Sequence, residues 1–316
     1  MMGAHQTSVT NLTDLRGAAR RAEGPAKVFT QIVDLTDLES VHDMRTPLPE
    51  AAGDLQTPSR TIGLFGAKGG VGCTTLACNV GGALVRRGLN AAVVDMDLQL
   101  GAVPVSLNVV PQRSVAEVMD EVVRAGSGPV TSGLDRHASG LHLLAQGDRI
   151  EEIAQVSSER LPRLFDAMGR TFQYVVVDGL RDFSDLSVAT LDLCNVIGVV
   201  VTQDVPAVRA AQRALVLFER LGYPADRIRV VLNRWQRKAR VSIDAVQAAL
   251  GCPVDAIVRN DFPTVERAVD HGLLLAEAAP KSGLTADLDD LLPHLANLPA
   301  RTPQGRFARV FGTRSN

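Results

Sequence analysis

Six short runs of apolar, mostly β-branched residues recur between residues 61 and 233, and none of them alternates regularly with polar residues. A strand that is apolar at every position is buried on both faces, as strands of parallel sheets are. The pattern therefore predicts six buried parallel strands, at residues 61–65, 91–95, 141–145, 174–178, 196–202 and 228–233.

Helical periodicity fills most of the intervals between these runs. Segments with this spacing lie at 74–87, 158–169, 205–222 and 241–251, and a last helix is expected over Leu284 to Leu298. Strand and helix alternating along a chain are typical of an α/β fold with a doubly wound, mostly parallel sheet. Ligands of such folds bind at the carboxyl ends of the strands.

The chain divides by composition into three parts. Residues 1–58 are rich in Thr, Ala, Asp, Gly and Pro, and only Val28 to Leu35 resembles a strand, which predicts a flexible N-terminal arm. Residues 59–300 carry the strand and helix pattern and are expected to form one nucleotide-binding domain. Residues 301–316 form a short C-terminal tail.

Composition narrows the class of protein further. A net charge of -2 argues against a chain dominated by nucleic-acid binding. The four cysteines have no CxxC spacing and the six histidines no metal-binding spacing, which suggests reduced thiols in a cytoplasmic protein without a zinc site. The sequence shows no signal peptide and no apolar run of about 18 residues, so a cytoplasmic location is expected.

A glycine-rich segment stands between the first predicted strand and the first helix. Its glycines let backbone N–H groups turn toward a phosphate, with a helix N-terminus behind them. A threonine hydroxyl at the start of that helix is a natural ligand for Mg²⁺. The segment therefore predicts a phosphate loop, whose candidate nucleotide-binding residues are Lys68, Gly69, Gly70, Val71, Gly72, Cys73, Thr74 and Thr75.

The text KGGVGCTT resembles the deviant Walker A motif of the MinD/ParA/ArsA-type ATPases, which usually reads KGGVGKTT, and the likeness extends over about residues 60–298. The resemblance implies ATP and Mg²⁺ as cofactors and an ATP-dependent homodimer in which Lys68 reaches the partner's phosphates. Cys73 stands where the family has the lysine common to P-loop enzymes. Losing one charge-assisted phosphate contact weakens binding about 10- to 150-fold. ATP binding is therefore expected to survive better than rapid hydrolysis.

Carboxylates follow two of the predicted strands. Strand alternation is expected to point Asp95 and Asp97 the same way, at the carboxyl edge of the sheet. On the resemblance, Asp97 orients the attacking water and is catalytic together with Lys68. Asp178 matches the Walker B aspartate, so that Thr74, Asp95 and Asp178 are the expected metal-binding set.

The end of the sixth predicted strand matches the family in a further residue. Asn233 stands where these ATPases have the asparagine that reads the adenine edge, although an asparagine that only caps the strand end would fit the text as well. Two positions differ from the usual family text. The segment DGLRD leaves the role of Arg181 open, and Arg259 replaces a proline.

The segments VLNR, VSIDAVQAALGCPV and EAAPKSGL resemble the CpaE/TadZ branch, MinD-like proteins that localise Tad/Flp-type pilus assembly machinery. This resemblance implies a nucleotide-dependent positioning factor whose partners belong to a pilus or secretion apparatus, at the inner membrane or cell pole. The alternatives are ParA-type DNA partition and MinD-type placement of the division site. An ATP-dependent enzyme built on the same fold is the weakest of the hypotheses.

A basic segment surrounds Trp235 and contains Arg234, Arg237, Lys238 and Arg240. Four cations are able to neutralise DNA phosphates, yet a solvated loop is the more common role of such a run, so DNA is not the expected partner.

The C-terminal tail contains three apolar residues, Phe307, Val310 and Phe311, that would share one face of a helix. Such a face would make a weak peripheral membrane anchor, and a frayed tail is the favoured alternative.

Cys73 itself has a second expected property. A thiol at a helix N-terminus, surrounded by backbone N–H groups, has a depressed pKa and oxidises readily. Oxidation there would block the phosphate site. A cysteine that is simply a tolerated small residue is the favoured alternative.

Overall fold

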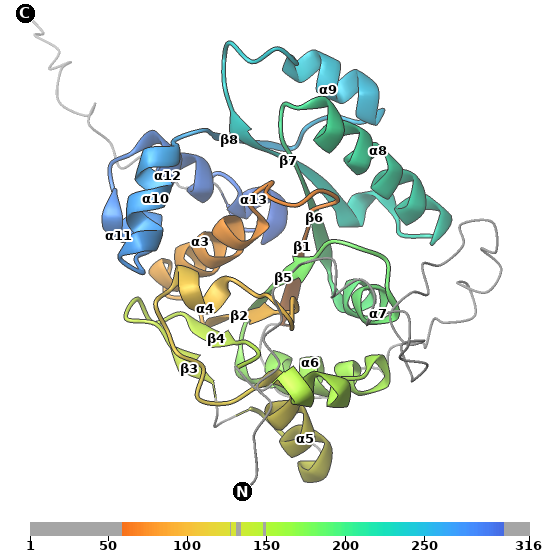
Figure 1. Cartoon of the computed structure of the whole chain (residues 1–316), viewed down its shortest axis with the longest axis vertical. Coiled ribbons are helices and arrows are strands. Elements are labelled where there is room, and N and C mark those ends of the chain that lie inside the picture. Colours follow the sequence, from red (N-terminus) through yellow and green to blue (C-terminus); the bar gives the residue numbers. More distant parts are fainter. Residues whose placement is uncertain (1–58, 127, 131–133, 148–149, 300–316) are drawn as a thin grey trace, which may run out of the picture. The chain divides into compact units, whose positions relative to one another are not determined.

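The computed structural model describes residues 59–126, 128–130, 134–147 and 150–299. The expected N-terminal arm, its strand-like segment 28–35 and the C-terminal tail lie outside the described residues. An eight-stranded sheet in the order β3-β4-β2-β5-β1-β6-β7-β8 runs through the described part (Figure 1). Every pairing is parallel except that of β3 with β4. The predicted doubly wound α/β class is confirmed.

The central strands are buried, as their apolar sequences predict. All five residues of β2 and all six of β6 are buried, and in β1 only the first residue is partly exposed. Each of the six predicted strands is present within about two residues of its expected bounds. The strands are β1 (Arg60–Phe65), β2 (Ala91–Asp95), β3 (Asp135–Arg136), β4 (His142–Leu144), β5 (Tyr174–Leu180), β6 (Val196–Val201), β7 (Ile228–Trp235) and β8 (Ala256–Arg259).

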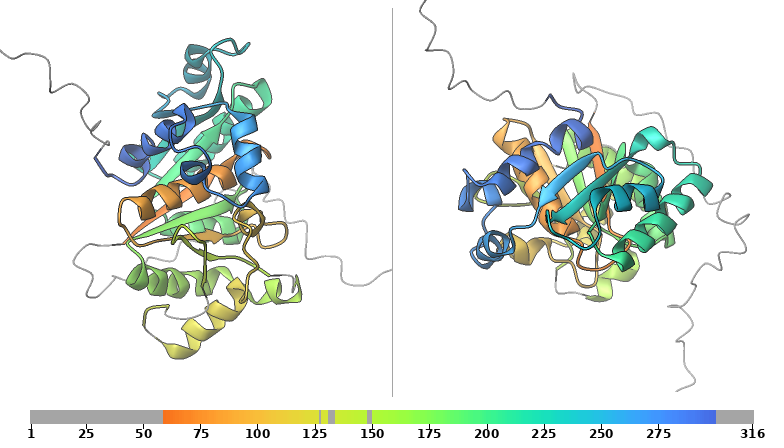
Figure 2. Two further views of the ribbon diagram at one scale, coloured as in Figure 1. Left: turned by 90° about the vertical axis from the view of Figure 1, so that its left-hand side faces the viewer. Right: turned by 90° about the horizontal axis from the view of Figure 1, so that it is seen from above.

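Helices cover both faces of the sheet, and the right-hand view of Figure 2 separates the orange and blue helices from the green and teal ones. One layer contains α3 (Cys73–Arg86), α4 (Val103–Ser106), α10 (Phe262–Asp270), α11 (Leu275–Ala278), α12 (Gly283–Asp289) and α13 (Leu292–Leu295). The other layer contains α5 (Val115–Ala125), α6 (Leu161–Thr171), α7 (Asp185–Leu193), α8 (Val205–Arg220) and α9 (Ile243–Leu250). Short 3₁₀ turns lie at Ile150–Gln155, Ser158–Arg160 and Ala225–Arg227.

Local sequence explains where several helices begin. Asp204 caps α8 by accepting a hydrogen bond from the Ala207 N–H, and Ser242 caps α9 in the same way. Ser114 and Glu117 form a reciprocal capping box at the start of α5. Such caps satisfy backbone donors that have no partner inside the helix. The cap of α8 matters for the site because it places Asp204 at the carboxyl edge of the sheet.

The expected helix over 284–298 is wrong as one element. The chain forms α12 and α13 instead, and the second begins only at Leu292. Pro293 explains the break, because proline inside a helix removes a backbone donor and clashes with the preceding turn. The strands β3 and β8 were not expected. They are short edge strands, and β8 alternates between buried and exposed residues, so neither carries the continuous apolar signal of the centre.

Candidate functional site

The predicted phosphate loop leaves the end of β1 and enters α3 at Cys73. Gly70 and Gly72 have φ angles of +79° and +98°, a region that residues with a side chain rarely adopt. A β-carbon at Gly72 would collide with the side-chain amide of Asn233, whereas Gly69 and Gly70 face open space. The loop is therefore packed against β7 at one end and leaves an open cradle of backbone at the other.

A cleft opens over this cradle at the carboxyl edge of the sheet. It lies where β1, β2, β5 and β7 end, which is the position expected for a ligand of a doubly wound sheet. The loop residues from Lys68 to Thr74 line it together with side chains from the other strand ends. Those further residues are Gly66, Asp97, Leu100, Ala102, Asp178, Gly179, Leu180, Arg181 and Arg234.

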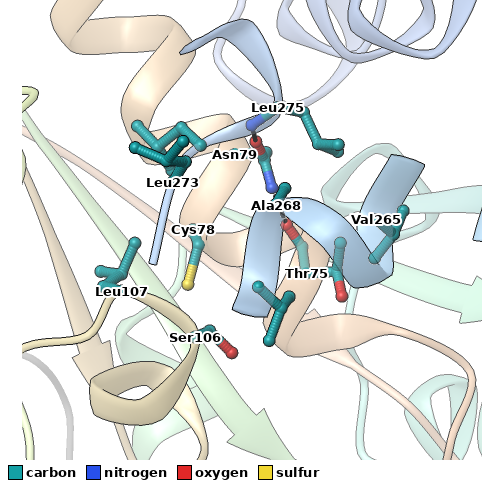
Figure 3. A pocket seen from close by; sticks show the side chains of 11 residues that line it. Thr75, Cys78, Asn79, Ser106, Leu107, Val265, Ala268, Leu273 and Leu275 are labelled. Carbon is teal, nitrogen blue, oxygen red and sulfur yellow. Dashed lines mark hydrogen bonds between the residues drawn. The ribbon is translucent and has the colours of Figure 1, made fainter. Parts of the chain in front are cut away.

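Two candidates from the sequence lie behind the loop rather than in the cleft. The buried Asn233 donates a hydrogen bond of 2.7 Å from its amide nitrogen to the Val71 carbonyl, so it holds the loop in place. Thr75 lines a small pocket on the other side of α3, where Figure 3 shows Asn79 between Thr75 and Leu275. That Asn233 reads adenine stays a prediction.

Thr74 and Asp178 meet at the floor of the cleft. The Thr74 hydroxyl donates a hydrogen bond of 2.6 Å to Asp178 Oδ2. The other oxygen, Oδ1, is buried and accepts no hydrogen bond of ordinary geometry among the described residues, although the backbone N–H of Gly179 favours the charged form and lowers the pKa of the carboxyl. A buried carboxylate oxygen without a partner is costly unless a cation or donor meets it. The pair therefore fits a Mg²⁺ ion beside a nucleotide, a site that rarely needs more than one or two protein ligands.

Asp95 lies deeper than the strand pattern predicts. It pairs with Asp178 in the register of β2 and β5 and is 1% exposed. Its two oxygens accept hydrogen bonds of 3.0 Å each, from the backbone N–H groups of Asp97 and Val103. The structure therefore does not bring Asp95 to the cleft lining, because β2 ends at this residue and strand alternation no longer governs Asp97.

Asp97 does line the cleft, where it is paired with a cation. The guanidinium of Arg181 lies 3.0 Å from Asp97 Oδ2 through Nη1 and donates a 3.2 Å hydrogen bond to Oδ1 through Nη2. Arg181 follows β5 and Asp97 follows β2, which are neighbours in the sheet. The role of Arg181 could not be predicted from the sequence, since its position beside Asp97 depends on strand order.

Lys68 stands at the rim of the cleft, 3.5 Å from Asp204. Burial would raise the pKa of Asp204, but hydrogen bonds from Thr202 and the Ala207 N–H and the charge of Lys68 hold it below its ordinary value. Asp204 was not among the site residues predicted from the sequence. Its position directly after a buried strand and before a helix was the available signal, because such positions gather at the carboxyl edge.

A family model described as the CobQ/CobB/MinD/ParA nucleotide binding domain matches residues 62–274, which is more than half of the chain. The chain belongs to this family. Among relatives in sequence, an uncharacterized ATP-binding protein of Methanocaldococcus jannaschii is 23% identical over 70% of this chain and 81% of its own length. The septum site-determining protein MinD of Thermotoga maritima is 25% identical over 60% of this chain and 72% of its own.

Solved structures of the MinD/ParA kind share the fold. A ParA family ATPase from Chlorobium tepidum superposes with a TM-score of 0.70 at 23% identity, covering 75% of this chain and all of that one. The septum site-determining protein MinD of Pyrococcus horikoshii, complexed with Mg-ADP, has a TM-score of 0.63 at 18% identity and covers 74% of this chain and 96% of its own. At these identities the likeness shows the fold alone.

Within this MinD/ParA-family domain, the expectation of a reactive Cys73 is wrong. Burial and the nearby Asp178 carboxylate raise the pKa of the Cys73 thiol far above its ordinary value. These effects outweigh the backbone N–H groups of the helix start, which alone would lower it. The thiol therefore stays protonated at neutral pH, and a thiol that forms no thiolate is a poor target for oxidation.

The buried carboxylates of this MinD/ParA-family site predict a pH-dependent stability. Burial, and then the charge of Asp178, raise the pKa of Asp95 to about 7, and burial raises that of Asp178. Since the folded pKa values lie above the unfolded ones, the folded state holds more protons between about pH 4 and 7. Stability should fall as pH rises through that window, by up to about 1.4 kcal/mol per unit for one carboxyl, and level off above it.

Urea unfolding of the nucleotide-free protein in chelator, between pH 5.5 and 8, measures this effect. The Asp178→Asn variant should show a flatter profile, because it removes one carboxyl with a raised pKa and a charge that adds to the effect of burial on Asp95. A midpoint that rises across the window in both proteins would show that other groups dominate.

Proposed function

We propose that this chain is an ATP-binding, MinD-like positioning factor that dimerises with nucleotide, hydrolyses ATP slowly and serves a Tad/Flp-type pilus or secretion apparatus. One observation carries the proposal. The phosphate loop, the Thr74–Asp178 pair and Asp97 surround a single cleft, while position 73 offers a neutral thiol where a cation would speed phosphoryl transfer. The site is thus built to hold a nucleotide more than to turn it over.

The residues present suit Mg·ATP. The backbone at Gly69 and Gly70 faces open space and would offer N–H groups to a phosphate, and helix α3 begins directly behind the loop. Thr74 and the unpartnered oxygen of Asp178 would hold the metal. Among the described residues no group of three His, Cys, Asp or Glu side chains forms a metal site, so the metal would depend on the nucleotide for its other ligands. When bound, Mg²⁺ supplies charge neutralisation of the phosphates.

Slow hydrolysis follows from the residue at position 73. Cys73 provides no charge, and removing one electrostatic donor from a transition state typically costs about 10²–10³ in rate. Asp97, the candidate for orienting water, lines the same cleft. The missing charge leaves nucleotide affinity less affected than turnover, because charge on the phosphate develops further in the transition state.

Dimerisation through the cleft face is supported by what surrounds it. Lys68 is 41% exposed and its pairing with Asp204 is weak for that reason, so it is free to reach across to a partner. The chain after β2 exposes Leu100, Val105 and Val110 by 79%, 73% and 75%. Leu100 lines the cleft, and exposed apolar side chains on the segment that borders a ligand site suit contact with a second copy.

The apparatus that the dimer serves is proposed on the CpaE/TadZ resemblance. No helix in the described part of the chain is long and apolar enough to cross a membrane, and a peripheral place at the inner membrane or cell pole is part of the proposal. DNA partition is the alternative, favoured by the exposed side chains of Arg237, Lys238 and Arg240 beyond β7. Salt-sensitive retention of duplex DNA by the ATP-bound protein would select it.

Replacing Lys68 by alanine is expected to abolish the ATP-dependent dimer. Because Lys68 is the only lysine of the loop, the mutant should remain monomeric with saturating Mg·ATP and bind ATP at least tenfold more weakly. Light scattering after size exclusion, with a parallel ATP titration, measures both. Lys281→Ala, which removes an exposed lysine outside the cleft lining, is the matched control. A dimer that forms without ATP and is equally stable in the mutant would contradict ATP-dependent dimerisation through Lys68. A wild-type protein that binds no ATP at millimolar concentration would contradict the proposed ATP-binding function itself.

A further inference from the structure

We propose that Arg181 supplies the phosphate-binding cation that position 73 lacks, by exchanging Asp97 for the terminal phosphate when ATP binds. The inference rests on the proposed function, ATP binding in the cleft. The cation that contacts the terminal phosphate would then come from the segment after Asp178, where the sequence DGLRD places an arginine three residues further along the chain.

The backbone holds Arg181 at the cleft. β5 continues past Asp178, and the Gly66 N–H donates a 2.9 Å hydrogen bond to the Leu180 carbonyl, which ties the segment to the start of the phosphate loop. Gly179 has a φ of +86°, and a β-carbon there would collide with the backbone of Met96 and Asp97. This close approach, open only to glycine, sets Arg181 beside Asp97 on the same rim.

The contact between Arg181 and Asp97 is one that a phosphate can replace. The guanidinium meets the carboxylate through two nitrogens, at 3.0 and 3.2 Å, which is the fork geometry that also suits a phosphate. The Arg181 side chain is 55% exposed and that of Asp97 is 16% exposed, so water reaches the guanidinium and screens its attraction to the carboxylate. A terminal phosphate carries more charge than one carboxylate, so the exchange is favourable and releases Asp97.

The other cations of the cleft are less well placed. Lys68 pairs with Asp204, beyond β6. Arg234 is the last residue but one of β7, and in the sheet β5 and β7 lie on opposite sides of β1. Asp178 belongs to β5 and accepts the hydrogen bond of Thr74. The metal and the terminal phosphate are therefore expected on the side of Arg181.

Binding of Mg·ATP and Mg·ADP to Arg181→Gln, Arg181→Lys and wild type, measured by calorimetry, tests the assignment. We expect Arg181→Gln to weaken Mg·ATP about 10- to 100-fold and Mg·ADP less than about threefold. Arg181→Lys should recover part of the loss, because a cation remains. Arg213→Gln, which removes an exposed arginine on α8 outside the cleft lining, should match wild type.

Two backgrounds separate phosphate binding from a restraint on Asp97. In Cys73→Lys the added lysine makes Arg181 partly redundant, so Arg181→Gln should cost less ATP affinity than in wild type. In Asp97→Asn the ion pair is already gone, yet Arg181→Gln should still weaken ATP. Unchanged ATP affinity of Arg181→Gln, or an effect that vanishes in Asp97→Asn, would overturn the assignment while ATP binding by wild type stands. Failure of wild type to bind ATP would instead overturn the proposed function and this assignment with it.

Discussion

Replacing Cys73 by lysine is expected to tighten Mg·ATP binding about 10- to 150-fold and to raise turnover about 10²- to 10³-fold. The wild-type thiol is neutral, since burial and Asp178 raise its pKa, so the change adds a full charge to the loop. That charge would stand at the start of α3, beside the Thr74–Asp178 pair. It acts more strongly on turnover than on affinity because charge on the phosphate develops further in the transition state.

Single-turnover hydrolysis and calorimetric binding measure the two quantities separately. Cys73→Ser is the matched control, because it keeps a small neutral side chain and should behave like wild type in both. A wild-type protein that already hydrolyses ATP as fast as the lysine variant would contradict the proposed site. The outcome would mean that Lys68 or Arg181 fully replaces the missing charge in the transition state.

Replacing Asp178 by asparagine is expected to stabilise the nucleotide-free fold while it abolishes the metal-dependent part of nucleotide binding. Asp178 is buried, lies beside buried Asp95 and has one oxygen without a partner among the described residues. Asparagine keeps an oxygen for the Thr74 hydroxyl and removes a buried charge that its hydrogen bonds compensate only in part, since the pKa of Asp178 remains raised, for a gain of about 1–3 kcal/mol. For a domain of this size that raises the Tm by about 2–12 °C. Loss of a charged metal ligand should weaken Mg·ATP about 10- to 150-fold.

Thr74→Val separates these two effects. It removes the hydroxyl that bonds Asp178 and leaves the carboxylate charged, so Mg·ATP binding should fall while the Tm also falls. Thermal unfolding in chelator and with Mg·ATP gives both results for each variant. If Asp178→Asn lowers the Tm as Thr74→Val does, the folded protein stabilises the charge of Asp178. That outcome would contradict the prediction that this charge destabilises the nucleotide-free fold.

Several features of the site were predictable from local sequence. The phosphate loop could be placed because a glycine-rich turn between an apolar strand and a helix has one common use in α/β folds. Asp178 could be placed at the cleft because it ends an apolar run, and Asp97 because it follows such a run by two residues. The ends of these runs gather at one edge of a parallel sheet. The prediction for Asp95 was less accurate, because its direction depends on backbone N–H groups of the chain that follows β2.

The sequence by itself determined the α/β class, the six buried strands and the position of the phosphate loop, because these depend on hydrophobic period and on turn chemistry within about 15 residues. Only the tertiary structure decided which distant side chains meet. The pairs Arg181 with Asp97, Lys68 with Asp204 and Asn233 with the Val71 carbonyl each join different strand ends. It also decided the ionisation of Cys73, since burial and a carboxylate 105 positions away along the chain outweigh the local effect of a helix N-terminus. Strand order and burial are properties of the assembled sheet, and no local pattern contains them.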